Sequence, residues 1–159
     1  MSDDDSVFLA TSKPASDVAE WLAGTLGLER VDDPELTDGQ HFFRGRARTV
    51  DGKLLVLVEP NNYGEVDPEP DEVSAIDDYS VFVDIRYAGK KDEELQQREA
   101  RAVFDELVKT QPDLAMILSH NLALFVAAYL PGAGVQYFEP GTTLDAPDID
   151  TWRPWVVAD

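Results

Sequence analysis

The fold is decided by residues 80–131, which run SVFVDIRYAGKKDEELQQREARAVFDELVKTQPDLAMILSHNLALFVAAYLP. Alternating apolar side chains predict a strand at 81–87, and an apolar repeat of helical period predicts a long helix after it. Asp92 suits the N-cap of this helix and Pro112 closes it. The apolar stripe of the helix is expected to consist of Gln96, Ala100, Val103, Phe104, Leu107 and Val108.

The end of this stretch predicts a second pair of strands. Residues 114–119 and 122–130 are apolar and flank His120-Asn121, which suits a turn. A single helix over 113–130 is the alternative, because Ala, Leu and Met also favour helices.

The N-terminal part of the chain begins with the same elements. Residues 1–6 are expected to form a frayed acidic lead, and residues 7–11 a short strand. Ser16 suits the N-cap of a following helix, and Gly27 suits its end. A polar loop is expected at 29–40, which contains proline and glycine.

A hairpin is expected next. Strands at 41–50 and 53–59 flank Asp51-Gly52, and Pro60 ends the second strand. An Asp-Gly pair is typical of two-residue turns, in which both residues take a positive φ.

Strand, helix and hairpin therefore occur twice, at 7–60 and 81–131, as a repeat of pattern without residue identity. We expect an α+β fold with an antiparallel sheet of about six strands and two helices packed on one face. It is built as two β-α-β-β units plus a C-terminal tail. The length fits a single domain over 1–159, in which an acidic loop at 61–79 joins the units and the tail spans 132–159.

Two architectural resemblances follow from this order of elements. The duplicated strand-helix-hairpin unit resembles the twofold modules of the GyrI-like small-molecule-binding and inhibitor proteins. From Ser16 onward, the order helix, three strands, helix, two strands is similar to the acidic chaperones of type III secretion and the YbjN-like proteins. The second resemblance implies a protein that binds other proteins and catalyses nothing. Neither assigns a role to a particular residue.

The charge of the chain limits its partners. There are 32 acidic and 13 basic residues, which give a net charge of −19. Nucleic-acid binding requires a basic footprint, and anionic membranes repel such a chain, so neither partner is expected. The chain contains no cysteine and no apolar run long enough for a membrane span. A cytoplasmic location is expected.

Two explanations of the acidity remain open. It can be a trait of a salt-adapted proteome that keeps proteins soluble, or it can be directed at a basic partner.

The acidic loop is the first candidate site. Its carboxylates could steer and bind a basic protein surface, with a tyrosine at each end as an aromatic anchor. A solvated spacer is the simpler interpretation, and a calcium site is disfavoured because EF-hand spacing is absent. The candidate contacts are Tyr63, Glu65, Asp67, Glu69, Asp71, Glu72, Asp77, Asp78 and Tyr79.

Three arginines form the second candidate site. Arg44, Arg46 and Arg48 alternate along the first hairpin, so period two predicts that they share one face of a strand. Guanidinium groups match carboxylates and phosphates, which makes this stripe a candidate anion clamp. The simpler interpretation is a solvent-facing stripe paired with acids across the sheet.

Other motifs indicate no catalytic chemistry. His41 and His120 lack metal-ligand spacing, and Ser119 and His120 are strand neighbours that face opposite ways. No GxSxG, P-loop or GxGxxG motif occurs. No enzyme activity, metal or cofactor is expected.

The tail carries two tryptophans, Trp152 and Trp155. We expect them to hold the tail against the body while Trp21 packs in the core, with residues 135–138 forming a short extra strand. The alternative is an exposed aromatic patch, so a homodimer through this tail or through a sheet edge is a further partner hypothesis.

The sequence therefore favours a non-enzymatic, acidic protein-binding module that shields a basic or cryptic surface of a partner, as an immunity protein or a secretion chaperone does. The alternative is a small-ligand binding protein with a pocket between sheet and helices and the arginine clamp.

Overall fold

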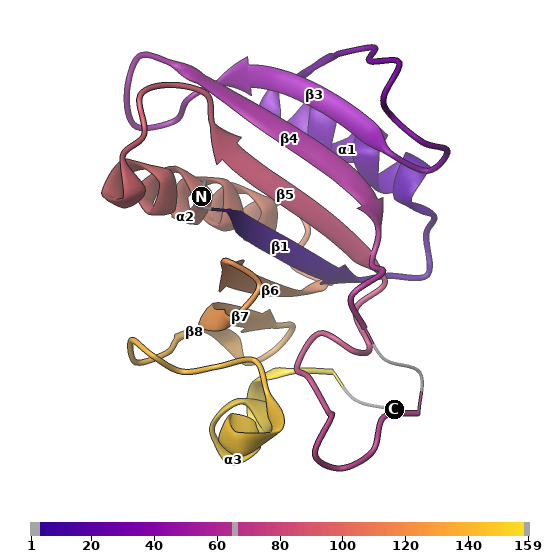
Figure 1. Cartoon of the computed structure of the whole chain (residues 1–159), viewed down its shortest axis with the longest axis vertical. Coiled ribbons are helices and arrows are strands. Elements are labelled where there is room, and N and C mark those ends of the chain that lie inside the picture. The colour runs from indigo at the N-terminus through magenta and orange to yellow at the C-terminus, as the bar shows by residue number, and fades with distance from the viewer. Residues whose placement is uncertain (1–3, 65–66, 158–159) are drawn as a thin grey trace.

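A computed structural model describes residues 4–64 and 67–157 of the chain. Its described strands form one eight-stranded antiparallel sheet, in the order β2-β3-β4-β5-β1-β6-β7-β8 (Figure 1). The strands are β1 (Asp5–Ala10), β2 (Glu29–Arg30), β3 (His41–Arg46), β4 (Lys53–Pro60), β5 (Val81–Tyr87), β6 (Ala115–His120), β7 (Leu124–Leu130) and β8 (Gly134–Tyr137). The helices are α1 (Ala15–Leu26), α2 (Glu93–Thr110) and α3 (Ile149–Trp152), and 3-10 turns at Ala146–Asp148 and Arg153–Trp155 flank α3.

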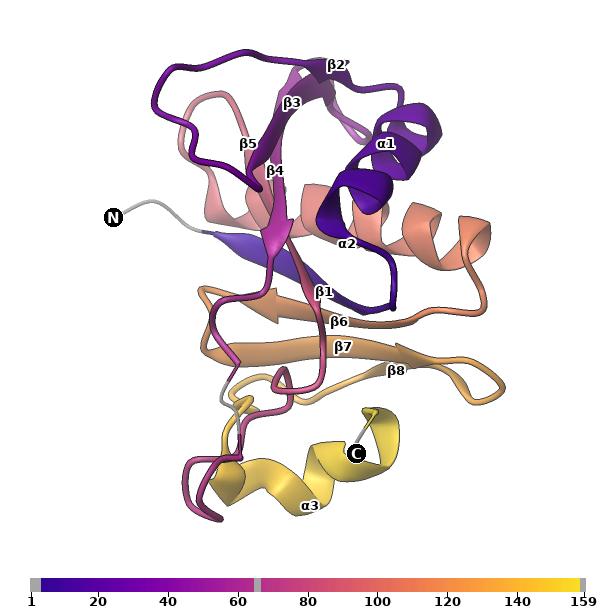
Figure 2. The ribbon, with the colours of Figure 1, turned by 90° about the vertical axis from the view of Figure 1, so that its right-hand side faces the viewer.

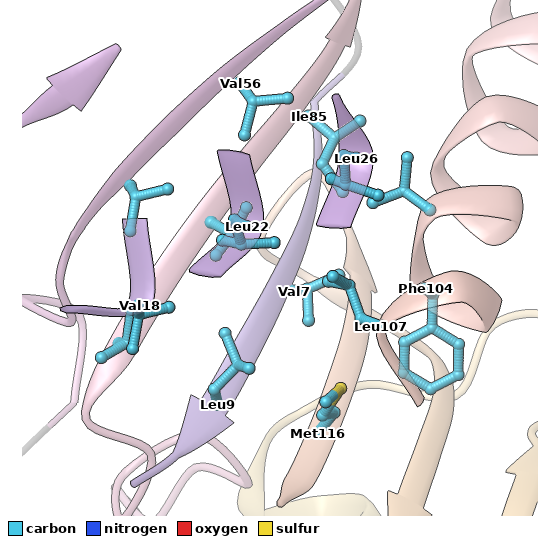
Figure 3. Packing of buried hydrophobic residues seen from close by; sticks show 14 of the residues in the cluster. Val7, Leu9, Val18, Leu22, Leu26, Val56, Ile85, Phe104, Leu107 and Met116 are labelled. Carbon is cyan, nitrogen blue, oxygen red and sulfur yellow. The ribbon is translucent and has the colours of Figure 1, made fainter. Parts of the chain in front are cut away.

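The predicted α+β class is confirmed, with α1 and α2 lying on the same face of the sheet (Figure 2). Between helices and sheet lies the first core, which Figure 3 shows from close by. Its members recur at helical spacing on the helices and at every second position on the strands. They include Val7, Leu9, Val18, Leu22, Val56, Ile85, Phe104, Leu107 and Met116.

The local signals for α2 are confirmed. Asp92 is the N-cap, and its side chain accepts a hydrogen bond from Leu95 N at 3.1 Å. Helix α1 ends as predicted at Gly27, whose φ of 66° is the left-handed conformation that glycine tolerates. The predicted N-cap of α1 is wrong by two residues, because Pro14 occupies that position without a side-chain hydrogen bond.

The hairpin predicted within 114–130 is confirmed as β6 and β7, so the alternative helix is wrong. Its turn contains Asn121 and Leu122 with φ of 54° and 57°. All six residues of β6 are buried, because β6 pairs with β1 and β7 and is covered on both faces. Because both faces of β6 are buried, its sequence lacks the alternation of apolar and polar residues that identifies a strand. It therefore resembles the sequence of a buried helix.

The first hairpin is present, but its predicted two-residue turn is wrong. Arg46 pairs with Lys53, so the connection is the six-residue loop 47–52. The buried Glu99 of α2 accepts hydrogen bonds from Arg48 N and Thr49 N, both at 2.6 Å. This carboxylate holds the loop open, a long-range contact that overrides the local preference of Asp51-Gly52 for a tight turn.

Apart from the two-residue strand β2, the β-α-β-β order occurs twice along the chain, but the two units do not occupy equivalent places in the sheet. The second hairpin strand of the first unit, β4, pairs with β5. The first hairpin strand of the second unit, β6, pairs with β1. Strand β2 lies within the predicted loop 29–40, and β8 corresponds to the short strand expected in the tail. These two strands raise the count from about six to eight.

The other face of the sheet is covered over only part of its width. A second core lies there, between β1, β5, β6 and β7 on one side and the segments 73–79 and 144–157 on the other. Ala75 N donates to Leu144 O at 2.8 Å, which joins the two covering segments. We call these two segments the cover. The cover confirms that the tail packs on the body, and the second half of the acidic loop packs with it.

Candidate binding surface

The face of β3, β4 and β5 that points away from the helices forms the best-defined candidate surface. Because Phe43, Val56 and Ile85 point into the first core, their strand neighbours point to the opposite side. Strand register places these neighbours in two rows across three strands. One row is Phe42–Leu57–Asp84 and the other is Arg44–Leu55–Arg86. We call this surface the open face.

A shallow depression marks the open face. Its volume is about 180 Å³, and it is lined by Phe42, Leu55, Leu57, Asp84 and Arg86. The three apolar side chains are only partly buried, whereas their neighbours in the first core are fully buried. The open face thus presents apolar surface between charged groups, an arrangement that suits contact with another molecule.

Tyr63 lies where the open face meets the second core. The residue is 50% exposed, and the centroid of its ring lies 5.1 Å from that of the Phe82 ring. Phe82 in turn packs on Phe8 in the second core, with ring centroids 5.3 Å apart. This tyrosine is therefore an exposed aromatic group held in place by a buried one.

At the Asp84 end of the depression, carboxylates outnumber the one arginine there, whereas Arg44 and Arg46 lie on β3. Arg86 Nε lies 3.0 Å from Asp84 Oδ2 and 3.0 Å from Asp4 Oδ1. One guanidinium group is therefore shared by two carboxylates. Glu59, two residues after Leu57 on the same side of β4, accepts a hydrogen bond from Gln40 at 3.1 Å. The electrostatics favour an incoming cation.

Burial raises the pKa of Asp84 from its ordinary 3.8 to about 6, and Arg86 offsets only part of the shift. Between about pH 4 and pH 6 the folded chain holds this proton more tightly than the unfolded chain, so stability falls as pH rises. Asp84→Asn removes the effect. Relative to the parent, its free energy of unfolding should rise across that window by up to about 2–3 kcal/mol.

Urea unfolding at a series of pH values between about 4 and 8 measures this difference. Asp38→Asn, at an exposed position in the loop before β3, serves as the matched control and should show no comparable rise across that window. A difference between Asp84→Asn and the parent that stays constant with pH would contradict the assignment.

The three arginines of the predicted anion clamp do not act together. Arg44 and Arg46 are exposed on the open-face side of β3, and Arg44 pairs with Glu29 at 3.0 Å. Arg48 lies beyond the strand, so the expectation of one shared face is wrong for this residue. Its guanidinium group donates to Leu26 O at the end of α1 and pairs with Glu106 at 2.9 Å.

The predicted contacts of the acidic loop divide into two groups. Glu65 lies outside the described residues. Asp77 accepts a hydrogen bond from Ser74 N at 2.8 Å within the cover. Tyr79 is 1% exposed and its hydroxyl accepts from Val157 N, so the expectation that it anchors a partner is wrong. The exposed candidates are Tyr63, Asp67, Glu69, Asp71, Glu72 and Asp78.

The tryptophans are placed as expected for a structural role. Trp152 is 3% exposed, and its indole N–H donates to Asp145 O at 3.0 Å. Trp155 packs against the same second core. Trp21 packs against the first core and lines a cavity of about 80 Å³. Trp152 is therefore not available as an exposed dimer contact.

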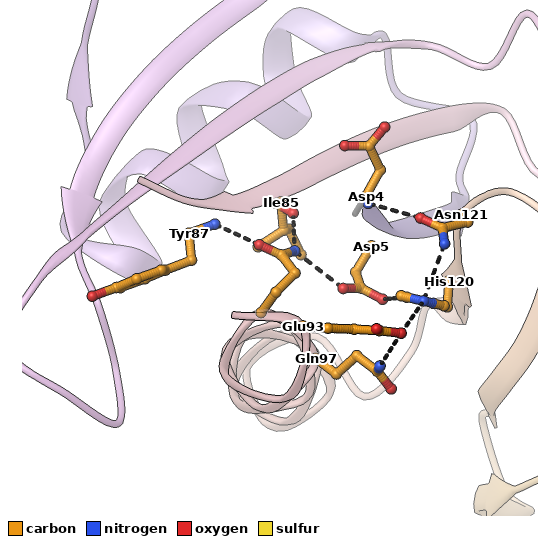
Figure 4. Close-up of polar contacts among 9 residues, drawn as sticks. Asp4, Asp5, Ile85, Tyr87, Glu93, Gln97, His120 and Asn121 are labelled. Carbon is orange, nitrogen blue, oxygen red and sulfur yellow. Dashed lines mark hydrogen bonds and ion pairs between the residues drawn. The ribbon is translucent and has the colours of Figure 1, made fainter. Parts of the chain in front are cut away.

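A buried polar network, not predicted from the sequence, joins β1, α2 and β6 (Figure 4). His120 Nδ1 lies 2.8 Å from Asp5 Oδ1, and Gln96 Nε2 donates to Asp5 Oδ2 at 3.1 Å. Asp5 and His120 are 2% and 6% exposed. The expectation that Asp5 belongs to a frayed lead is wrong, because this network holds it in the sheet. Residues 1–3 lie outside the described part of the chain.

This network fixes the orientation of His120 but provides no nucleophile. Its neighbour Ser119 faces the second core, as expected for adjacent strand residues. Glu93 Oε1 lies 3.6 Å from His120 Nε2 at the start of α2. We therefore interpret the network as a structural connection between three elements.

Among the described residues, no group of three or more His, Asp or Glu side chains is arranged to hold a metal ion. In this described part of the chain, no helix is both long enough and apolar enough to cross a membrane. Comparisons with protein-family models, curated proteins and solved structures found no match to this chain.

Proposed function

We propose that this chain is an acidic protein-binding module that docks a basic segment of a partner protein on its open face. The observation that supports the proposal is that the cover packs on only part of one face of the sheet. The cover seals the face of β1, β6 and β7, while Leu55, Leu57 and Phe42 stay partly exposed on the neighbouring strands.

Charge supports a basic partner. The net charge of −19 speeds encounter with a cationic surface, and this effect weakens as salt is added. The exposed loop carboxylates Glu69, Asp71 and Glu72 contribute to that field. In this proposal the loop steers the partner, and the apolar open face supplies most of the binding energy.

The small-ligand alternative receives less support. Drug-sized ligands occupy pockets of about 300–1,000 Å³. The cavity beside Trp21 measures about 80 Å³ and the depression on the open face about 180 Å³. A larger depression of about 520 Å³ lies along α2, but charged and polar side chains of that one helix line it, and it is not a pocket between sheet and helices. Between the sheet and the helices, Phe104 of α2 is fully buried in the first core.

The test begins with affinity capture from a lysate of the source cells at low salt, followed by calorimetry with the purified candidate partner. Leu57→Asp should weaken binding at least about tenfold, because it places a carboxylate in the apolar contact. Val135→Asp makes the same change at an exposed strand position on β8, outside the open face, and should leave the affinity unchanged.

Charge reversal of the loop separates steering from docking. Glu69→Lys combined with Asp71→Lys and Glu72→Lys should slow association and reduce its salt dependence, with little effect on dissociation. The proposed docking on the open face fails if Leu57→Asp binds as tightly as the parent, and the proposed steering fails if association does not respond to salt.

A further inference from the structure

We propose that the depression on the open face receives a single lysine side chain of the partner, whose ammonium group binds Asp84 Oδ1. This inference rests on the proposed function and names the chemistry that the partner segment must carry. The methylene stem of the lysine would lie against the apolar walls of the depression.

The shape of the depression matches one side chain. Phe42, Leu57 and Asp84 lie in one row across β3, β4 and β5, so the carboxylate stands at the end of an apolar path. Leu55 and Arg86 in the adjacent row complete the lining. An apolar wall that ends in a carboxylate fits lysine, which buries its stem on apolar surface and keeps its charged end polar.

Charge at the end of the path is unbalanced. Arg86 is shared between Asp84 Oδ2 and Asp4 Oδ1, each 3.0 Å from its Nε. Within residues 4–64 and 67–157, no hydrogen bond reaches Asp84 Oδ1. Ser6, the neighbour of Asp84 across β1, is fully buried on the same face, and its hydroxyl has no described hydrogen-bond partner. A carboxylate oxygen is therefore left for a cation from outside.

Lysine fits this carboxylate better than arginine. Arginine binds carboxylates most strongly through two parallel hydrogen bonds, which require both oxygens. Here Asp84 Oδ2 is already occupied by Arg86. An ammonium group is a compact charge that needs only one oxygen.

Binding should depend on pH, because the ammonium group requires ionised Asp84. The charged and titratable groups around it are Arg86 on the same strand, Asp4 and Asp5 at β1, and Tyr63 at the end of the open face. Glu59 on β4 and Arg44 on β3 lie further along the same face. Burial raises the pKa of Asp84 to about 6, so a cation that binds there must displace its proton below that pH. Lysine binding should weaken from pH 7.5 to about pH 5.

The experiment uses the full chain and acetylated, amidated nonapeptides with one central lysine flanked by leucines. Matched peptides carry arginine or norleucine at the central position. Nuclear magnetic resonance titration should place the shifts at Leu55, Leu57 and Asp84. The lysine peptide should bind at least about tenfold more tightly than the norleucine peptide and severalfold more tightly than the arginine peptide.

Variants of the chain test how much the Asp84 carboxylate contributes to lysine binding. Asp84→Asn should reduce binding of the lysine peptide to the level of the norleucine peptide, while Asp17→Asn on α1 should have no effect. If Asp84→Asn does not fold, Leu57→Ser replaces it, and this variant should weaken lysine and norleucine peptides alike. Equal binding of lysine and norleucine peptides by the parent, or shifts confined to another surface, overturns the inference.

Binding of the partner protein by two variants distinguishes a failure of the lysine inference from a failure of the proposed function. If Leu57→Asp abolishes binding of the partner protein and Asp84→Asn does not weaken it, the open face is the docking surface and the lysine inference is wrong. If Leu57→Asp leaves partner binding intact, the proposed function itself is wrong.

Discussion

Trp152→Ala is expected to lower the free energy of unfolding by about 3–5 kcal/mol, measured by urea denaturation. The indole is 3% exposed in the second core and also donates a hydrogen bond to Asp145 O. The substitution therefore leaves a cavity and removes the partner of a carbonyl group. It acts where the cover is attached, so both covering segments should lose protection from hydrogen exchange before the helices do.

Trp155→Ala is the matched control for this change. Trp155 packs at the edge of the same core and remains partly exposed, so its loss should cost less than half as much. Trp152→Phe should give an intermediate loss, because it keeps an aromatic ring but no N–H group. Equal effects of Trp152→Ala and Trp155→Ala would contradict the central place of Trp152 in the second core.

Glu99→Ala is expected to lower the free energy of unfolding by about 2–4 kcal/mol. The carboxylate is fully buried on α2 and accepts hydrogen bonds from Arg48 N, Thr49 N and the Thr49 hydroxyl. Alanine would leave two backbone N–H groups without acceptors under α2. The loop 47–52 would then have to rearrange or admit water.

Glu94→Ala is the control on the same helix, where the side chain is exposed, and its effect should stay within about 0.5 kcal/mol. Glu99→Gln keeps one acceptor oxygen and should cost less than Glu99→Ala. Thermal and urea unfolding measure all three variants. If Glu99→Ala and Glu94→Ala unfold at the same urea concentration, the buried carboxylate does not support the hairpin.

Elements with local signals could be predicted from the sequence. Helix α2 has a capping aspartate, an apolar stripe and a following proline within one continuous segment. The β6-β7 hairpin was harder, because double burial removes alternation, and the repeated order of elements was what favoured strands over a helix. The signals for α2 thus lie close together in the chain, whereas the hairpin is favoured by comparison with the first unit.

Features that depend on distant residues could not be predicted. The loop 47–52 takes its shape from Glu99, about fifty residues later in the chain. Asp5 belongs to a strand rather than to an acidic lead because His120 and Gln96 reach it. Tyr79 borders an acidic loop in sequence, yet the folded tail buries it. In each case the partner that decides the structure lies outside any local window.

The sequence does not predict the open face, for the same reason. Strand β4 carries apolar residues on both of its faces, as the sequence shows. Which of the two faces stays uncovered follows only from the order of the strands in the sheet. Asp84 was the available signal, since a carboxylate interrupts an otherwise apolar strand. A charged residue within a strand core is expensive to bury and often marks a site.

The central position of β1 also has a consequence for how the chain acquires its fold. Strand β1 leaves the ribosome first among the strands but pairs only with β5 and β6, and its Asp5–His120 contact spans 115 residues. Such a high contact order makes folding slow, and it delays completion of the sheet until β6 has been translated. The apolar segment Val7, Phe8 and Leu9 has no partner strand until β5 has been translated, and only one until β6 follows. Mutual repulsion between strongly negative nascent chains would protect that segment from aggregation during the interval.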